Sequence, residues 1–408
     1  MLLFHAIKIV KKHMHFLYNL LIALYGFFIR VAAVCNTKVK KREIGSKHWE
    51  IQLKGVGNIQ QSVVWIHCAS AGEFEQAIPI IQELKQKYPS YFIAVSFFSP
   101  SGYELYKDSS LADIFFYFPL DTVKNAKKII QLLQPRKVLF IRNEIWWNIL
   151  LELNKQQIQT YLINNSLVKN NSFIYQFYLE KTLPLFTAIF NTQAYGNTKL
   201  ERVLENKVME FKDDKLDNFC KQSFVLILGS SWSTELQYIF NFYKKYSIHF
   251  PALKIIIAPH EFDENTLNKI CKNHHLPKNE IQLYSDYNLS KNANFLLLDK
   301  KGILKYAYRY ADIAFIGGGF DKTVHNTSEA IVYGIPTLFG PNFSKFEEVI
   351  EFIKNGIAFP IGSYDEFEKN VLSVLWHPKI KEEIKKKSES FFSRQQATSK
   401  RIISEIMQ

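Results

Sequence analysis

The chain has 408 residues, 47% of them hydrophobic and 22% charged, and its 51 Lys and Arg against 38 Asp and Glu give a formal net charge of +13. This length suits two or three domains with sizeable cores, and the near-average composition excludes a disordered or fibrous protein. The charge is uneven, because nine of the Lys and Arg residues and only two acidic residues lie among residues 1–50. A local basic patch is therefore favoured over an even basic coat that would bind nucleic acid.

The N-terminal segment is predicted to be a membrane anchor. Residues 16–29 are apolar apart from Asn19, and residues 14–35 together reach the ~20 residues that a membrane span needs. Lys38–Arg42 forms a basic run that suits an anionic membrane surface and keeps the following domains on the cytoplasmic side of the membrane. The helix either spans the bilayer or lies in its interface, and a buried core helix is the alternative.

The four cysteines, Cys35, Cys68, Cys220 and Cys271, are far apart and form no CxxC motif. They are expected to be reduced thiols of a cytosolic protein, most of them buried as small hydrophobic residues. No zinc site is expected.

Strands and helices alternate through the first half of the chain. Strands are expected at residues 62–70, 92–99, 137–141 and 160–164. This alternation predicts a parallel sheet covered on both faces, with a ligand site beyond the carboxyl ends of the strands.

Ser70, Ala71 and Gly72 follow the first of these strands and supply a tight turn with backbone N–H groups at a helix start. Such a turn is a natural site for an anion. Glu73 stands next in the first helical turn, where a carboxylate either complements the helix dipole or serves catalysis.

Glu144 lies at another strand end, in the segment Arg142-Asn143-Glu144-Ile145-Trp146-Trp147. The two tryptophans have two interpretations. They form one wall of a sugar pocket, or they pack in the core.

A second alternating series follows a charged and irregular segment after Asn206. Its strands are expected at residues 224–231, 254–260, 295–299, 311–319 and 335–341. The two halves predict two α/β, Rossmann-like domains facing a cleft.

Gly317, Gly318 and Gly319 end one of these strands, and Asn326 and Glu329 follow at a spacing that puts both on one helix face. Glycines let a backbone approach a ligand closely, and their N–H groups hold phosphate. We interpret the combination as a nucleotide site. It matches neither the dinucleotide fingerprint nor a Walker loop.

A second glycine loop, with Lys300, Lys301 and Gly302, follows the strand at 295–299. Its backbone N–H groups and two cations could bind a phosphate. A solvated loop is the equal alternative.

Motifs spread over nearly the whole chain resemble those of the bacterial Kdo transferases, which add 3-deoxy-D-manno-octulosonic acid (Kdo) to a lipid A precursor. The matching segments, in chain order, are Asn36-Thr37-Lys38, His67-Cys68-Ala69-Ser70-Ala71-Gly72-Glu73, Ser99-Pro100-Ser101-Gly102, Glu144-Ile145-Trp146, Asn164-Asn165-Ser166-Leu167, Gly317-Gly318, His325-Asn326-Thr327-Ser328-Glu329, Gly334-Ile335-Pro336 and Gly340-Pro341. The Ser-x-Gly-Glu motif behind an anchor helix is the most specific of them.

The resemblance implies a GT-B glycosyltransferase fold, CMP-Kdo as donor, a lipid A precursor as acceptor, and no metal or other cofactor. It assigns Glu73 as the general base of an inverting transfer and Glu144 as a second acidic residue near the acceptor. Contacts to CMP carry over to Pro259, His260, Lys301, Gly302, Ile303, Gly317, Gly318, Asn326, Thr327, Ser328 and Glu329. The implied organisation is an anchor at 1–35, an acceptor domain at 36–210, a donor domain at 211–385, and a C-terminal helix at 386–408 packing back on the first domain.

Two positions depart from the family pattern. His260 stands where the family often has arginine, so a permanent cation near the phosphate is either missing or supplied elsewhere, and Lys300 and Lys301 are the candidates. Lys301-Gly302-Ile303 replaces a common methionine-glycine-glutamate. Two rival functions remain: a GT-B enzyme that uses a UDP-sugar and another lipid acceptor, and a basic membrane-tethered module without enzymatic activity.

Overall fold

The computed structural model describes residues 2–165, 172–263 and 265–408, and of residues 2–13 only the helical backbone. Ser166 and Leu167, which the sequence analysis included in one motif, lie outside the described residues.

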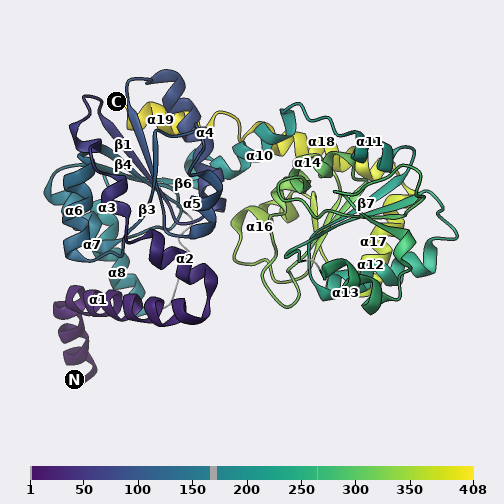
Figure 1. Cartoon of the computed structure of the whole chain (residues 1–408), viewed down its shortest axis with the longest axis horizontal. Coiled ribbons are helices and arrows are strands. Elements are labelled where there is room, and N and C mark those ends of the chain that lie inside the picture. The colour runs from purple at the N-terminus through teal and green to yellow at the C-terminus, as the bar shows by residue number, and fades with distance from the viewer. Residues whose placement is uncertain (1, 166–171, 264) are drawn as a thin grey trace. The chain divides into compact units, whose positions relative to one another are not determined.

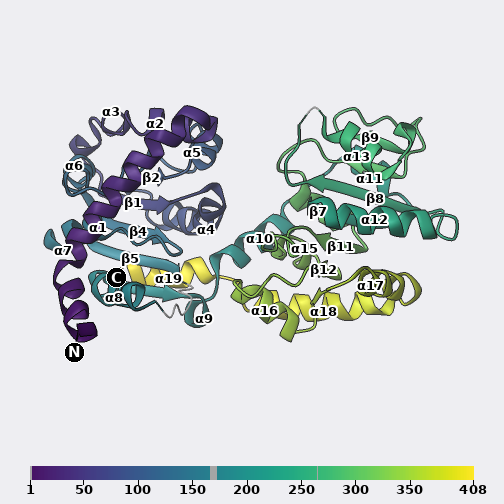
Figure 2. The same cartoon turned by 90° about the horizontal axis from the view of Figure 1, so that it is seen from below.

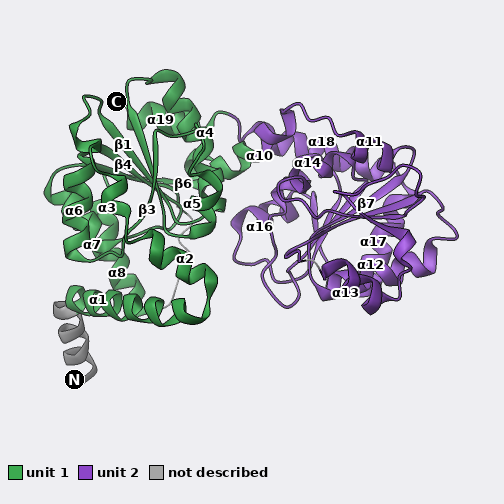
Figure 3. Ribbon diagram, viewed as in Figure 1, with its two compact units in different colours: residues 1–202, 397–408 green, residues 203–396 purple. Residues whose placement is uncertain are grey.

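The chain divides into two compact units (Figure 3). Unit 1 comprises residues 1–202 and 397–408, and unit 2 comprises residues 203–396. The boundaries predicted from the sequence are 210/211 and 385/386. The first true boundary falls inside a helix, where sequence composition gives no signal.

Unit 1 contains a six-stranded parallel sheet in the order β3-β2-β1-β4-β5-β6 (Figure 1). Its strands are β1 (Val63–Cys68), β2 (Phe92–Phe97), β3 (Ile114–Tyr117), β4 (Pro135–Ile141), β5 (Gln159–Asn165) and β6 (Ala188–Asn191). The chain runs from β1 outward to β3 and then returns to β4 on the other side of β1. The topological switch point, where open α/β sheets bind ligands, therefore lies between the carboxyl ends of β1 and β4.

Helices cover both faces of this sheet. They are α1 (Leu2–Cys35), α2 (Thr37–Gly45), α3 (Trp49–Gln52), η1 (Val56–Asn58), α4 (Ala71–Lys87), α5 (Pro100–Tyr106), α6 (Val123–Leu133), α7 (Trp147–Lys155), α8 (Phe173–Thr182), η2 (Leu183–Leu185), α9 (Thr192–Tyr195) and α19 (Thr398–Ile406). Successive side chains of β1 point to opposite faces of the sheet. All six are buried, because an apolar core covers each face. The C-terminal helix α19 buries Ile402, Ile403 and Ile406 in the core that contains α4.

Polar side chains fix one face of α1 to unit 1. The Tyr18 hydroxyl donates to Asp121 at 2.6 Å and accepts the backbone N–H of Trp147 at 3.3 Å. The Asn148 amide donates to the Asn19 side chain at 2.9 Å. Because Asp121 and Asn148 are buried, these bonds fix one turn of α1, which runs along the unit (Figure 2).

The opposite face of α1 is apolar and exposed. It carries Phe16, Leu20, Leu21, Leu24, Phe27, Phe28, Val31 and Val34. Residues Met14–Cys35 are long and apolar enough to cross a membrane by length and composition. The packed face of α1 thus combines the polar contacts of Tyr18 and Asn19 with buried Met14, Ile22 and Ile29, while the other face is apolar and exposed.

Unit 2 contains a seven-stranded parallel sheet in the order β13-β12-β11-β7-β8-β10-β9. Its strands are β7 (Phe224–Ser231), β8 (Leu253–Pro259), β9 (Ile281–Leu283), β10 (Phe295–Leu297), β11 (Ile313–Ile316), β12 (Thr337–Phe339) and β13 (Ala358–Pro360). Its helices are α11 (Asp214–Cys220), α12 (Ser233–Tyr246), α13 (Thr266–His274), η3 (Lys278–Glu280), α14 (Leu304–Ala307), η4 (Tyr308–Tyr310), α15 (Ser328–Ile331), α16 (Glu347–Lys354), α17 (Tyr364–Trp376) and α18 (Lys379–Ser393), while α10 (Thr198–Val208) crosses the division between the units.

Candidate active site

Glu73 lies in the first turn of α4, directly beyond β1. Ser70 is the N-cap residue of this helix, but its side chain makes no capping hydrogen bond. The Glu73 carboxylate instead turns back and accepts the backbone N–H of Ala69 at 2.5 Å. Ala71 and Gly72 complete the turn, and Gly72 is exposed. The turn therefore presents a carboxylate, held by the backbone, at the end of the central strand.

Glu144 follows β4, the neighbour of β1. Its carboxylate accepts the indole N–H of Trp146 at 2.8 Å and lies 3.3 Å from Nε2 of His67 on β1. Arg142, the first residue beyond β4, has a left-handed backbone with φ of 69°. This conformation is uncommon for a non-glycine residue, and strained backbone positions cluster at functional sites. The turn brings Glu144 back toward β1.

Aromatic rings cover the contact between His67 and Glu144. The His67 ring stacks on Phe118 at 4.0 Å between centroids, and Trp146 lies 5.2 Å from Phe118 and 5.5 Å from Phe98. His67 is fully buried, with Nδ1 2.8 Å from the Ser96 hydroxyl. These packed rings restrict the positions open to Glu144.

The two adjacent tryptophans have different surroundings. Trp147 is buried against the rings of His15 and Tyr18 on α1, whereas Trp146 is half-buried and bonded to Glu144. Trp147 is a core residue, and Trp146 is part of the strand-end site.

The pKa of Glu73 is raised from its ordinary value of 4.5 to about 7. Burial is the main cause, and the charge of Glu144 adds to it. The backbone N–H groups of Ala69 and Ser70 and the charge of Arg142 act in the opposite direction. The carboxylate can therefore take up and release a proton near neutral pH.

In unit 2, the glycine loop beyond β11 packs closely against the ends of two neighbouring strands. A Cβ on Gly317 would lie 2.2 Å from the Ser230 carbonyl oxygen, and one on Gly319 would lie 2.6 Å from the backbone nitrogen of Gly340. Gly318 and Gly319 also have positive φ angles of 86° and 39°. Only glycine fits this loop, which keeps its backbone close to the strand ends.

Polar side chains without partners gather beside this loop. The amide nitrogen of Asn326 donates to Glu329 at 2.9 Å. The buried side-chain oxygens of Asn326, Thr327, Ser328 and Ser231 have no hydrogen-bond partner among the described residues. Buried polar groups are nearly always paired, so this cluster is suited to a polar ligand.

A stack of three rings lies at the same strand ends. Trp232 stacks on His260 at 4.7 Å, His260 on His325 at 4.4 Å, and the Trp232 indole N–H donates to His325 Nε2 at 3.0 Å. The ammonium of Lys322 lies 3.5 Å from the centroid of a Trp232 ring. Burial, with His260 and Lys322 nearby, lowers the pKa of His325 to about 4, so this imidazole is neutral at pH 7.

The expected donor residues occupy neighbouring strand ends. Pro259 is the register partner of Ser231, which places His260 beside the end of β7. Lys301 and Gly302 follow β10, the neighbour of β8, and both are exposed. Ile303 is the N-cap residue of α14.

Ser231, Trp232 and Lys322 were not predicted as site residues. Ser231 ends β7 and Trp232 follows it, so both stand at a strand end as Ser70 does, and Lys322 stands between the glycines and Asn326. These positions in the sequence could have identified them. In the part of the chain that the structure describes, no group of three His, Cys, Asp or Glu side chains is placed to hold a metal ion.

Comparisons with known proteins agree with this arrangement. Residues 42–217 match the family described as 3-deoxy-D-manno-octulosonic-acid transferase. A 3-deoxy-D-manno-octulosonic acid transferase from Aquifex aeolicus is 24% identical, over 81% of this chain and 90% of its own. One from Chlamydia trachomatis serovar D is 27% identical, over 71% of each chain.

Among solved structures, UDP-GlcNAc 2-epimerase from Neisseria meningitidis has a TM-score of 0.59 and 15% identity, covering 85% of this chain and 100% of its own. This likeness concerns the fold, which is the GT-B arrangement of two Rossmann-like domains. Residues 42–217 therefore match the model of this family, and most of the chain is similar in sequence to 3-deoxy-D-manno-octulosonic acid transferases.

Proposed function

We propose that the protein transfers Kdo from CMP-Kdo to a hydroxyl of a lipid A precursor, with inversion at the anomeric carbon and without a metal ion. The observation that carries the proposal is the half-buried Glu73 carboxylate at the switch point of unit 1, whose pKa of about 7 suits a general base. The family relatives support the donor sugar, because their names state that they transfer it.

The acceptor hydroxyl oxygen attacks the anomeric carbon of Kdo while Glu73 takes its proton. The bond between that carbon and the phosphate oxygen breaks, and CMP leaves with the electron pair. Glu144 assists by holding the pKa of Glu73 up, and Trp146 and His67 position Glu144. Removing the base should lower kcat by about 10²- to 10⁴-fold.

Unit 2 binds the donor nucleotide. The glycine loop offers backbone N–H groups, and the unpartnered oxygens of Thr327, Ser328 and Ser231 offer polar contacts. Lys322 supplies the cation near the phosphate, because His260 replaces the arginine common in the family and His325 is neutral.

The protein works at the cytoplasmic face of the inner membrane, with α1 lying in the interface. A spanning α1 would have to break the bonds that Tyr18 and Asn19 make with buried residues of unit 1. The exposed apolar face enters one leaflet, and the basic run at Lys38–Arg42 meets anionic headgroups.

The test is incubation of the purified full chain with CMP-Kdo and tetra-acylated lipid A precursor, followed by mass spectrometry of the lipid. The expected product carries Kdo, and Glu73→Gln should form almost none. No adduct with the wild type, or an undiminished one with Glu73→Gln, overturns the proposal. CMP and UDP are compared in a thermal-shift assay, since the nucleotide that binds raises the unfolding temperature. A shift with UDP alone favours the rival UDP-sugar transferase.

A further inference from the structure

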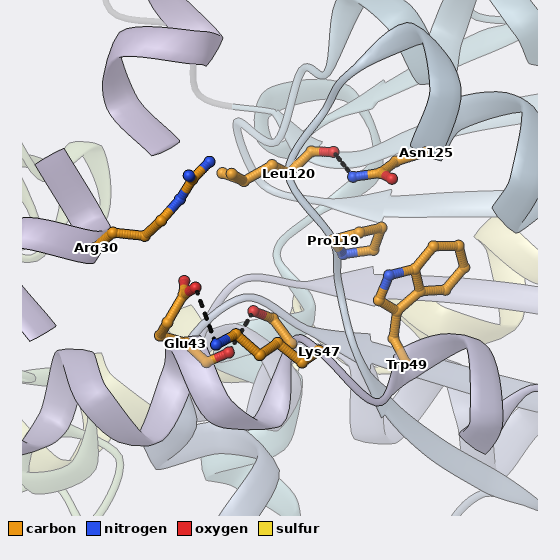
Figure 4. Close-up of a pocket in the computed structure, with 8 residues that line it drawn as sticks. Arg30, Glu43, Lys47, Trp49, Pro119, Leu120 and Asn125 are labelled. Carbon is orange, nitrogen blue, oxygen red and sulfur yellow. Dashed lines mark hydrogen bonds and ion pairs between the residues drawn. The ribbon is translucent and has the colours of Figure 1, made fainter. Parts of the chain in front are cut away.

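A cavity of about 380 Å³ opens between the last turns of α1, helix α2 and the loop after β3 (Figure 4). Its lining residues come from separate elements of unit 1: Arg30, Glu43, Ser46, Lys47, Trp49, Pro119, Leu120 and Asn125. The volume is that of a small-ligand site.

The lining carries an excess of positive charge. Arg30 reaches in from α1 and Lys47 from the segment after α2 (Figure 4). Glu43 lies 3.9 Å from Lys47, whereas Arg30 pairs with no carboxylate among the described residues. An anion would therefore find one cation free and a second within reach.

A third cation, Arg42, lies near this cavity. Arg42, next to Glu43, is buried, and none of its three guanidinium nitrogens has an acceptor among the described residues. Its guanidinium lies 4.0 Å from the centroid of Phe98, the ring that stacks on Trp146. The region between the cavity and Glu144 thus holds positive charge without a matching hydrogen-bond acceptor.

The cavity shares the carboxyl edge of the sheet with the candidate active site. Pro119 and Leu120 follow Phe118, whose ring contacts both His67 and Trp146. On its other side lies the stretch of α1 where Phe27, Phe28 and Val31 are exposed. A ligand here would be close both to the catalytic edge and to the apolar face of α1.

We propose that this cavity binds a phosphate group of the lipid acceptor, with Arg30 and Lys47 as its cationic contacts. The inference rests on the proposed function and specifies how the acceptor is recognised. The acyl chains lie along the apolar face of α1, the phosphate occupies the cavity, and the nucleophilic hydroxyl extends toward Glu73. The same cations could instead attract the phosphates of bulk anionic phospholipid, and the experiment separates the two sources.

The experiment compares Arg30→Gln/Lys47→Gln with Lys127→Gln/Lys155→Gln. Both double variants lose two positive charges from exposed residues of unit 1, but Lys127 and Lys155 do not line the cavity. Equilibrium binding of tetra-acylated lipid A precursor in detergent micelles is measured without donor. It is repeated with the same lipid after phosphatase treatment, and with phosphatidylglycerol vesicles.

The cavity variant should bind the phosphorylated precursor about tenfold more weakly than the wild type, which is the effect of losing charge-assisted hydrogen bonds. It should bind the phosphatase-treated lipid as the wild type does, and the control variant should retain affinity for both lipids. Equal losses in the two variants, or a loss confined to vesicles, would show that the cavity responds only to bulk phospholipid and overturn the proposal. Binding is measured without CMP-Kdo, so it does not depend on Kdo transfer. If the wild type transfers no Kdo, the proposed function is refuted, but the binding comparison still tests whether the cavity holds a lipid phosphate.

Discussion

Glu144 lies beside Glu73 across the ends of the adjacent strands β4 and β1, and its charge adds to burial in raising the pKa of Glu73 to about 7. The two carboxylates therefore have different environments. Glu144 is held by Trp146 and lies next to His67, while Glu73 is held mainly by backbone N–H groups of its own turn. Pairs of carboxylates whose environments differ in this way commonly divide the work of acid–base catalysis.

The rate of transfer should depend on the protonation of Glu73. A general base must be ionised, so kcat/KM should rise with pH through about 7. Glu144→Gln removes a negative charge and lowers the pKa of Glu73. The rise of kcat/KM with pH should therefore occur at lower pH in this variant. The measurement is kcat/KM from pH 5.5 to 8.5, with the exposed Glu180→Gln as a charge-matched control. If kcat/KM of Glu144→Gln rises over the same pH range as that of the wild type, Glu144 does not raise the pKa of Glu73.

Glu73→Gln should stabilise the protein above pH 7 while abolishing transfer. A raised pKa in the folded state means that ionising Glu73 costs stability, and this cost grows from pH 4.5, the ordinary pKa, to about pH 7. A neutral glutamine avoids it, for a gain of about 1 to 3 kcal/mol at pH 8 and little gain at pH 4.5. Thermal unfolding at the two pH values tests this. A variant less stable than the wild type at pH 8 would mean that the carboxylate is structural.

The central strands of both sheets could be predicted from sequence, because buried parallel strands are continuous apolar runs. The strands that were missed are β3, β6, β9 and β13, and each lies at an edge of its sheet. These strands have only three or four residues. A short strand with one neighbour owes its conformation to pairing across the sheet, which local composition does not reveal.

The candidate site was predictable in part for a similar reason. Glu73 and Glu144 follow apolar runs, so their positions at strand ends could be predicted. Their closeness could not, because it depends on β4 returning beside β1. Trp232 was overlooked, because its contacts with His260 and His325 join segments far apart in sequence.

Lys322, and not Lys301, should supply the cation for the donor phosphate. Lys322 touches the ring stack at the ends of β7 and β11, whereas Lys301 is an exposed residue in the loop beyond β10. Lys322→Ala should raise KM for CMP-Kdo about tenfold, as expected for the loss of one charge-assisted contact. Lys322→Arg should restore most of the affinity, and Lys301→Ala is the matched control. If Lys301→Ala has the larger effect, the assignment is wrong.

The hydroxyl of Tyr18 should stabilise the attachment of α1 to unit 1. Tyr18→Phe leaves the Asp121 carboxylate without one donor and the Trp147 N–H without its acceptor, at a cost of about 1 to 2 kcal/mol. Tyr25→Phe is the control, since the Tyr25 hydroxyl on the same helix has no hydrogen bond among the described residues. Chemical denaturation gives the stabilities, and the rate of tryptic cleavage at Arg30 reports the loosening of α1. Equal behaviour of the two variants would show that the Tyr18 bonds do not hold the helix.

The apolar face of α1 should bind the membrane without crossing it. Replacing Leu20, Leu24 and Phe28 with serine removes exposed apolar area and leaves the hydrogen bonds of Tyr18 and Asn19 intact. The variant should therefore stay folded but no longer bind anionic vesicles. Replacing the exposed Ile248 and Leu289 of unit 2 with serine should leave vesicle binding unchanged. A helix held in the interface should also be extracted from membranes by alkaline carbonate, whereas a spanning helix should remain. Retention of the wild type in the carbonate pellet would therefore contradict the interfacial position, because the polar face of α1 cannot both span a bilayer and stay bonded to Asp121 and Asn148.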